Sequence, residues 1–288
     1  MSFDDLPPLP PLIHPEANGY AIRCMAATRR VQAEANVAID LAYGGDYWQK
    51  LDIYRPKRID PAAGLPVLVF FHGGAWTNGT KEWMGFMAPP LTDIPIVYVA
   101  ANYRLAPAIR YPTIVEDCMA ATAWVRDNIR AYGGDPERLY VGGHSAGGHL
   151  AALVALDSGR GQAMGLPQGA IKACLTISAA FDFRARDALA GTMERRVYEQ
   201  VLAREADDEP ASPIVHVRRN APPFFIAWGE RDFPRLIKQG NAMAAALKQS
   251  GVAVETMVIP ETDHFEANEV CASPDSGWSV AARRWLTK

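Results

Sequence analysis

One serine of the chain stands in a context typical of catalytic nucleophiles. Ser145 is the centre of a Gly-x-Ser-x-Gly pentapeptide (residues 143–147), which follows a short apolar run and opens an Ala- and Leu-rich stretch. A serine on a sharp strand-to-helix turn has a strained backbone, and the flanking glycines avoid clashes that a Cβ would cause. The helix N-terminus would favour negative charge developing nearby. The pattern predicts a nucleophile elbow; a glycine-rich helix start with a capping serine is the alternative.

A serine nucleophile needs a general base, and six histidines compete for that role. His264 lies in a loop after the last predicted strand and before the last predicted helix, where the chain order Ser…Asp…His of a hydrolase sheet places its base. The rings of His144 and His149, on the turn and helix of the nucleophile itself, cannot easily reach back to the serine. We therefore predict His264 as the base, ahead of the other five: His14, His72, His144, His149 and His216.

The acid that orients the base should follow the strand before it. Asp232 lies just after the apolar run 223–228, and we predict it as this acid. Glu230 is a local rival, and Asp263 is adjacent to His264 in sequence, which would tend to turn its side chain elsewhere. Asp182, after the preceding strand, is the main alternative and stays open at this point.

A second motif could stabilise an oxyanion. The segment Phe-His-Gly-Gly-Ala-Trp (residues 71–76) directly follows the first buried apolar run. Acyl transfer requires backbone N–H groups aimed at the developing oxyanion. We predict that the amides of Gly74, Ala75 and Ala146 provide them, while His72 anchors the loop.

The same loop bears on substrate contacts. We expect Trp76, His144 and Phe181 to contact the substrate. Trp76 beneath a segment beginning at Phe181 should leave room only for a small acyl group, formyl or acetyl.

The elements that must position these residues alternate along the chain. Apolar runs predict strands, most of them buried on both faces of a sheet, at 67–71, 94–101, 139–142, 171–178, 223–228 and 252–259. Helical stretches lie between and after them at 113–130, 145–157, 234–249 and 274–286. Such alternation indicates right-handed crossovers and a mostly parallel twisted sheet with helices on both faces, an α/β fold.

Three further segments complete the predicted organisation. The first 15 residues, with five prolines, predict an extended arm that packs along the surface, followed by a short helix at 25–35; residues 1–36 form this N-terminal arm and helix. A hairpin is expected around residues 44–46. The charged segment 181–213 predicts a cap inserted over the carboxyl edge of the sheet. No linker interrupts the chain, so we expect one domain over residues 1–288.

The composition limits the classes of partner, cofactor and location that we expect. In 288 residues, 49% are hydrophobic and 21% charged, with a net charge of −3, which argues against nucleic acid or an anionic membrane as a partner. Four cysteines without a CxxC motif indicate neither a disulfide framework nor a metal site, so no metal or organic cofactor is expected. Without a signal peptide pattern or a long apolar span, we expect a cytoplasmic protein. Its partner would be a small molecule, and a homodimer stays open.

The motifs resemble those of known hydrolases. The chain is similar to α/β-hydrolase enzymes from about residue 51 to residue 269, and within them to the kynurenine formamidase (arylformamidase) group, which carries an HGGxW motif matched by residues 72–76. Residues 51–56, 143–147 and 263–266 add to this resemblance. Residues 102–107 and 111–117 also look like hormone-sensitive-lipase-type carboxylesterases, and residues 135–138 resemble a shared turn before the elbow strand. Ala75, however, stands where the HGGG motif of those carboxylesterases has a third glycine.

This resemblance implies an activity. An α/β-hydrolase fold would use Ser145, Asp232 and His264 as its catalytic triad. The expected function is hydrolysis of small carboxylic esters or N-formyl arylamides through an acyl-enzyme. The alternatives are a short- to medium-chain carboxylesterase without formamidase activity and a non-catalytic binding protein built on a hydrolase fold.

Overall fold

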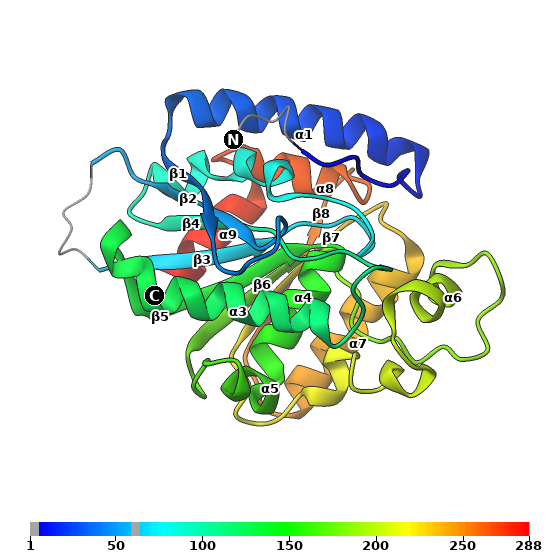
Figure 1. The fold of residues 1–288 in the computed structure, drawn as a ribbon. Helices are drawn as coiled ribbons and strands as arrows, with labels where there is room; N and C mark the ends of the chain where they lie inside the picture. The colour runs from blue at the N-terminus through cyan, green and yellow to red at the C-terminus, as the bar shows by residue number, and fades with distance from the viewer. Residues whose placement is uncertain (1–5, 59–63, 288) are drawn as a thin grey trace.

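An eight-stranded mixed sheet forms the centre of the computed structural model, which describes residues 6–58 and 64–287. The strand order is β1-β2-β4-β3-β5-β6-β7-β8 (Figure 1). The pairs β1–β2 and β2–β4 are antiparallel, and every other neighbouring pair is parallel. In chain order the strands are β1 (Asn36–Ala42), β2 (Lys50–Arg55), β3 (Leu65–Phe71), β4 (Val97–Ala101), β5 (Gly134–His144), β6 (Ile171–Ile177), β7 (Phe224–Gly229) and β8 (Val254–Ile259).

Helices cover both faces of this sheet, as the strand–helix alternation predicted. Figure 1 shows α1 above the sheet and α3 and α4 below it. Among the described residues, no helix has both the length and the apolar character needed to cross a bilayer. The α-helices are α1 (Pro15–Glu34), α2 (Pro89–Thr92), α3 (Thr113–Asn128), α4 (Ala146–Leu156), α5 (Ser158–Ala163), α6 (Met193–Arg196), α7 (Pro234–Gln249), α8 (Glu266–Glu269) and α9 (Gly277–Leu286).

Strand β3 shows why a continuous apolar run indicates a strand that is buried on both faces. Its side chains alternate between two separate cores: Val67, Val69 and Phe71 pack on the face covered by α3, α4 and α7, whereas Leu68 and Phe70 pack beneath α1, α2 and α9. All five are fully buried. Because both faces of a parallel strand are covered, every position must be apolar.

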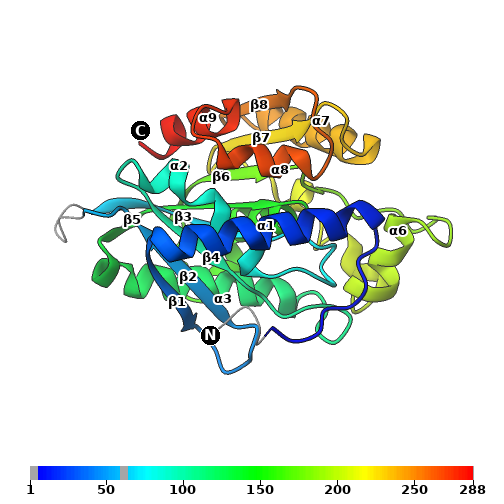
Figure 2. The same ribbon diagram turned by 90° about the horizontal axis from the view of Figure 1, so that it is seen from above.

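The N-terminal helix differs from its prediction. Instead of a short helix at 25–35, α1 begins at Pro15 and runs for 20 residues (Figure 2). Pro15 occupies the first helical turn, where its missing N–H costs no hydrogen bond, so this proline starts the helix rather than belonging to the arm. The Tyr20 hydroxyl donates to Asn268 in α8, and Arg23 pairs with Glu269.

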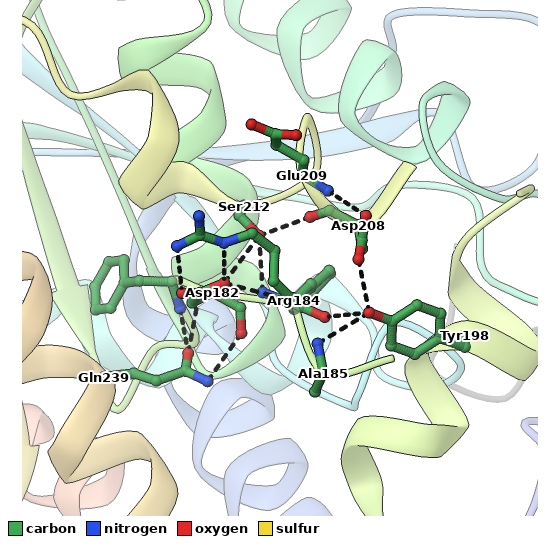
Figure 3. Close-up of polar contacts among 10 residues, drawn as sticks. Asp182, Arg184, Ala185, Tyr198, Asp208, Glu209, Ser212 and Gln239 are labelled. Atoms are coloured by element: carbon green, nitrogen blue, oxygen red, sulfur yellow. Dashed lines mark hydrogen bonds and ion pairs between the residues drawn. The ribbon is translucent and has the colours of Figure 1, made fainter. Parts of the chain in front are cut away.

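The segment between β6 and β7 folds into short helical turns, including α6, that lie beyond the sheet at one end of the molecule (Figures 1 and 2). Its loops are tied together by polar contacts (Figure 3). Asp208 accepts hydrogen bonds from Tyr198 and Arg186, and the Ser212 hydroxyl donates to the Asp208 carbonyl. The segment is therefore ordered by its own side chains rather than by regular secondary structure.

Candidate active site

The turn after β5 holds Ser145 in a strained conformation. Its φ of 54° and ψ of −118° are rare for a residue with a side chain. The Ser145 amide donates to the Ile177 carbonyl of β6. The glycine before the serine is required, because a Cβ on Gly143 would lie 2.3 Å from the carbonyl carbon of Gly147. The local sequence therefore folds as the predicted elbow, with Ser145 between β5 and α4.

Three side chains from the ends of three strands form a hydrogen-bonded relay. The Nε2 atom of His264, in the loop after β8, lies 3.0 Å from Ser145 Oγ. The Nδ1 atom of His264 lies 2.9 Å from Asp232 Oδ1, in the loop after β7. All three strands are parallel neighbours or near neighbours in the sheet, so their carboxyl ends meet at one edge. The structure brings together the residues that the sequence selected as nucleophile, base and acid.

The Asp232 carboxylate is suited to remain ionised. Burial alone would raise its pKa, but the hydrogen bond and charge of His264 and the Phe233 amide hold the pKa below its usual value. The neighbouring Ser178 hydroxyl also lowers it, although Oδ2 of Asp232 has no well-aligned hydrogen-bond partner among the described residues. An ionised Asp232 fixes His264 as the Nδ1–H tautomer, which leaves Nε2 free to accept the Ser145 proton.

The rival acids are engaged elsewhere. Asp182 accepts both hydrogen bonds of a bidentate pair from Arg184, at 2.9 and 2.8 Å (Figure 3). Glu230 accepts from the Glu261 amide. Asp263 accepts from the amides of Phe265 and Glu266, next to the start of α8. Of the four candidate acids, Asp232 is the one that contacts the imidazole.

The loop after β3 has an unusual backbone. Gly74, Ala75 and Trp76 have φ values of 118°, 52° and 62°. Gly74 has no alternative, since a Cβ there would lie 2.1 Å from the Asn78 carbonyl oxygen. The Gly74 carbonyl in turn accepts from the amides of Thr77 and Asn78, which fixes this tight turn.

The amides expected to hold an oxyanion are available. No acceptor in the described chain receives a hydrogen bond from the Gly74, Ala75 or Ala146 N–H. Ala146 is the first residue of α4, whose N–H groups have no partner within the helix. Gly74, Ala75 and Ala146 line the same cavity as Ser145, and an acyl-transfer site would need N–H donors there.

Two histidines support the site without contacting Ser145. His72 is fully buried, its Nδ1–H donates to the Gly73 carbonyl at 2.7 Å, and its ring stacks on Tyr103 at 4.3 Å, so it anchors the loop as predicted. Nε2 of His144 donates to the backbone carbonyl of His264 at 3.0 Å, and the two rings lie 4.8 Å apart. Burial, followed by the His264 charge, lowers the pKa of His144 to about 3, so His144 stays neutral.

A narrow cavity of about 50 Å³ opens on Ser145. Its walls are mostly apolar and include Trp76 and His144, two of the three predicted substrate contacts. The third, Phe181, is fully buried in the core, and its neighbour Ala180 lines the cavity in its place. Met193 of α6 adds a wall from the segment predicted as a cap.

The N-terminal arm forms a wall that the sequence did not reveal. Leu12, Ile13 and His14 line the cavity, and the His14 ring stacks on Phe233 at 4.9 Å. The Asn78 side chain holds the arm by donating to the Pro10 carbonyl. The arm was expected to pack along the surface only. Its proline spacing predicted an extended chain but carried no signal for the wall to which it docks.

His149 links the loop after β3 to the segment after β6. Its Nδ1 accepts from the Trp76 indole N–H at 3.1 Å, and since indole is a donor only, its Nε2 carries the proton and donates to the Ala211 carbonyl at 2.8 Å. Burial lowers the pKa of His149 to about 4, because a protonated ring would carry a charge that water cannot solvate. Protonation of Nδ1 would also break the hydrogen bond from the Trp76 indole.

This linkage predicts a pH-dependent stability. Between pH 6.5 and 4 the unfolded chain binds a proton at His149 that the folded protein excludes. The free energy of unfolding should therefore fall as the pH falls, by about 1.4 kcal/mol per pH unit from this residue. His149→Gln keeps an acceptor for Trp76 and a donor for Ala211 but does not titrate.

Urea unfolding at several pH values between 6.5 and 4.5 checks this expectation. In the variant, the slope of unfolding free energy against pH should be smaller by about 1.4 kcal/mol per pH unit, which is the contribution of one proton. Equal slopes for the two proteins would mean that His149 is protonated in the folded state.

Comparisons with known proteins agree with this architecture. Residues 68–267 match the family described as the alpha/beta hydrolase fold. Esterase LipQ of Mycobacterium tuberculosis is 33% identical over 247 residues, which cover 82% of this chain and 58% of LipQ. Kynurenine formamidase of Danio rerio is 29% identical over 244 residues, which cover 85% of this chain and 80% of that protein. The chain thus spans only a little over half the length of LipQ.

Solved structures are similar over nearly the whole chain. EstE1, a thermophilic carboxylesterase cloned from a metagenomic library, has a TM-score of 0.71 and 26% identity, covering 94% of this chain and 95% of its own. A truncated carbohydrate esterase from gut microbiota has a TM-score of 0.73 at 19% identity, covering 88% of this chain and 95% of its own, and this likeness shows the fold alone. With the family match over residues 68–267, the chain belongs to the α/β hydrolase family.

Proposed function

We propose that this protein is a serine hydrolase that cleaves small carboxylic esters and N-formyl arylamides through an acyl-enzyme. The observation that supports this best is the relay from Ser145 to His264 to Asp232. In the same cavity wall are three residues whose backbone amides donate to no acceptor in the described chain. The named relatives include both esterases and a kynurenine formamidase, which fits the two substrate classes.

The first half of the reaction acylates the serine. Ser145 Oγ bonds to the substrate carbonyl carbon while Nε2 of His264 takes the hydroxyl proton, and Asp232 stabilises the resulting imidazolium. The carbonyl oxygen becomes an oxyanion, to which the amides of Gly74, Ala75 and Ala146 donate. The bond from carbon to the leaving oxygen or nitrogen then breaks, and His264 transfers its proton to the leaving alcohol or arylamine.

The second half returns the enzyme to its starting state. Water gives a proton to Nε2 of His264 as its oxygen bonds to the acyl carbon, and the same amides stabilise the second oxyanion. The bond between carbon and Ser145 Oγ breaks, and His264 returns the proton to Oγ. The products are a carboxylic acid and the free serine, and water is the one reactant consumed besides the substrate.

The cavity favours a small acyl group. A volume of about 50 Å³ has room for only a few water molecules on the same scale. Trp76 cannot turn aside freely, because its indole is held by His149 and its ring meets Phe183 edge to face at 5.1 Å. Each methylene that does not fit must displace packed surface, at about 1–3 kcal/mol.

An acyl-chain panel tests the proposal. We expect nitrophenyl acetate to be cleaved faster than butyrate and octanoate, with about one to two decades of rate lost at the first misfit. N-formylkynurenine, which presents a formyl group on an arylamine, should be hydrolysed as well. The measurement is kcat/KM for each substrate, with product release followed by absorbance.

A wall variant provides the control for this panel. Met193→Ala removes a flexible side chain from the cavity wall and should raise the butyrate rate relative to acetate. A rate maximum at four carbons or longer in the natural protein, together with no deformylation, would instead indicate a carboxylesterase without formamidase activity.

We propose the cytoplasm as the location of this activity. The four cysteines, Cys24, Cys118, Cys174 and Cys271, are all buried and unpaired. Free thiols of this kind are typical of proteins that fold in a reducing compartment.

A further inference from the structure

One cation lines the candidate active site without an ion-pair partner in the described part of the chain. Arg235 lies in the first turn of α7, three residues after Asp232, and its side chain is half-buried in the cavity wall. Within the described ranges 6–58 and 64–287, no hydrogen bond or ion pair holds its guanidinium; its ring contact is with Phe233, whose centroid lies 5.9 Å away. Burial lowers the pKa of Arg235, and the charges of Glu194 and Asp232 offset this only in part.

Neighbouring arginines show how unusual this is. Arg184, Arg186 and Arg204, all in the segment after β6, each form a bidentate pair with an aspartate. Those pairs hold loops together on the surface. Arg235 faces the cavity instead, and a guanidinium is a fork of donors whose geometry matches a carboxylate.

The charge of the cavity fits an anion. Among the described residues that line the cavity, Arg235 is the one Lys or Arg, and none is an Asp or Glu. The nearest acids that act on Arg235 are Glu194 on α6 and Asp232, which exert a longer-range attraction without forming an ion pair. Asp232 is already committed to His264. A ligand carboxylate would therefore meet a positive, largely apolar site without a competing anion in contact.

The position of Arg235 indicates which part of a substrate it faces. The Phe233 ring lies beside both His264, at 4.8 Å between ring centroids, and the Arg235 guanidinium. His14 is also close enough to be affected by both groups. The pKa of His14 is lowered first by burial and then by the charges of His264 and Arg235. Arg235 thus lies on the histidine side of the cavity, and it is His264 that protonates the departing group.

We infer that Arg235 binds a carboxylate carried by the leaving group, so that the preferred substrates are formyl or acetyl compounds of an acidic alcohol or arylamine. The inference rests on the proposed function for its assignment of the leaving-group side. It makes Arg235 a specificity residue, one that touches the substrate but takes no part in bond breaking.

Matched esters test this inference. 4-Carboxyphenyl acetate and 4-carbamoylphenyl acetate share the acyl group and shape and differ in charge. Arg235→Gln should lower kcat/KM for the carboxylate ester by about 10- to 100-fold and change the value for the amide ester by less than about threefold. Arg235→Lys, which keeps the charge but loses the fork, should give an intermediate loss.

A control comes from the same helix. Lys238 is exposed, one turn beyond Arg235, and lines no part of the cavity. Lys238→Gln removes the same charge and should leave both esters unchanged. The inference would be overturned if Arg235→Gln lowered kcat/KM equally for the two esters. It would also be overturned if Lys238→Gln lowered kcat/KM for the carboxylate ester as much as Arg235→Gln does.

A binding measurement separates this inference from the proposed function. In Ser145→Ala, the fluorescence of Trp76 and Trp83, which line the cavity, reports occupancy without turnover. 4-Hydroxybenzoate should bind about 10-fold or more tightly than 4-hydroxybenzamide, and adding Arg235→Gln should abolish the difference. If the natural protein hydrolyses neither ester, the proposed function is refuted, but this binding difference would still support the carboxylate site. Equal binding of the two ligands would refute the carboxylate site.

Discussion

Ser145→Ala is expected to lower kcat/KM for nitrophenyl acetate by about 10³- to 10⁶-fold. The hydroxyl forms the covalent bond of both half-reactions. Among the described residues, the side-chain hydrogen bond of Ser145 Oγ is the one to His264. Its removal should therefore change chemistry far more than stability. The thermal unfolding midpoint of the variant should stay within a few degrees of the natural protein.

Covalent labelling gives an independent measurement of the same residue. A fluorophosphonate should modify Ser145 in the natural protein, and peptide mapping should find no adduct in the variant. Ser158→Ala, an exposed serine at the start of α5, should retain full activity and labelling. Labelling at another serine, or more than about a tenth of the natural activity in purified Ser145→Ala, would exclude the nucleophile elbow and favour a binding protein.

The parts of the fold predicted from sequence share one property: their signals are local. The buried run of β3 is apolar at every position because both faces are covered. The elbow requires a glycine at position 143 because a Cβ there would lie 2.3 Å from the backbone of Gly147. The loop positions of Asp232 and His264 follow from strand order alone. Each of these constraints acts on residues close in the chain, so it leaves a readable pattern.

The parts that sequence could not supply depend on contacts between distant segments. The arm lines the cavity because His14 stacks on Phe233 and Asn78 holds Pro10, and neither partner is marked by spacing or composition. Phe181 is as apolar as a cavity residue would be, yet it points into the core. The early start of α1 was missed because a proline run normally breaks helices, whereas a proline in the first turn starts one.

Asp232→Asn is expected to lower kcat/KM by about 10⁴-fold. The carboxylate accepts the Nδ1–H of His264 at 2.9 Å and so selects the tautomer whose Nε2 can accept the Ser145 proton. The amide nitrogen of asparagine can donate to Nδ1, which favours the opposite tautomer, with its proton on Nε2 and no lone pair facing Ser145. The loss should appear mainly in kcat, since Asp232 does not line the cavity.

Asp182→Asn provides the matched comparison, because sequence alone left Asp182 as the main alternative acid. Its carboxylate pairs with Arg184 and lies near the Ser212 hydroxyl, so the substitution removes a partly exposed ion pair worth about 0–1 kcal/mol of stability. Activity should stay within about threefold of the natural protein, and the two variants should differ by three decades or more. A larger loss for Asp182→Asn than for Asp232→Asn would move the acid to Asp182 and would require His264 to turn away from the hydrogen bond seen here.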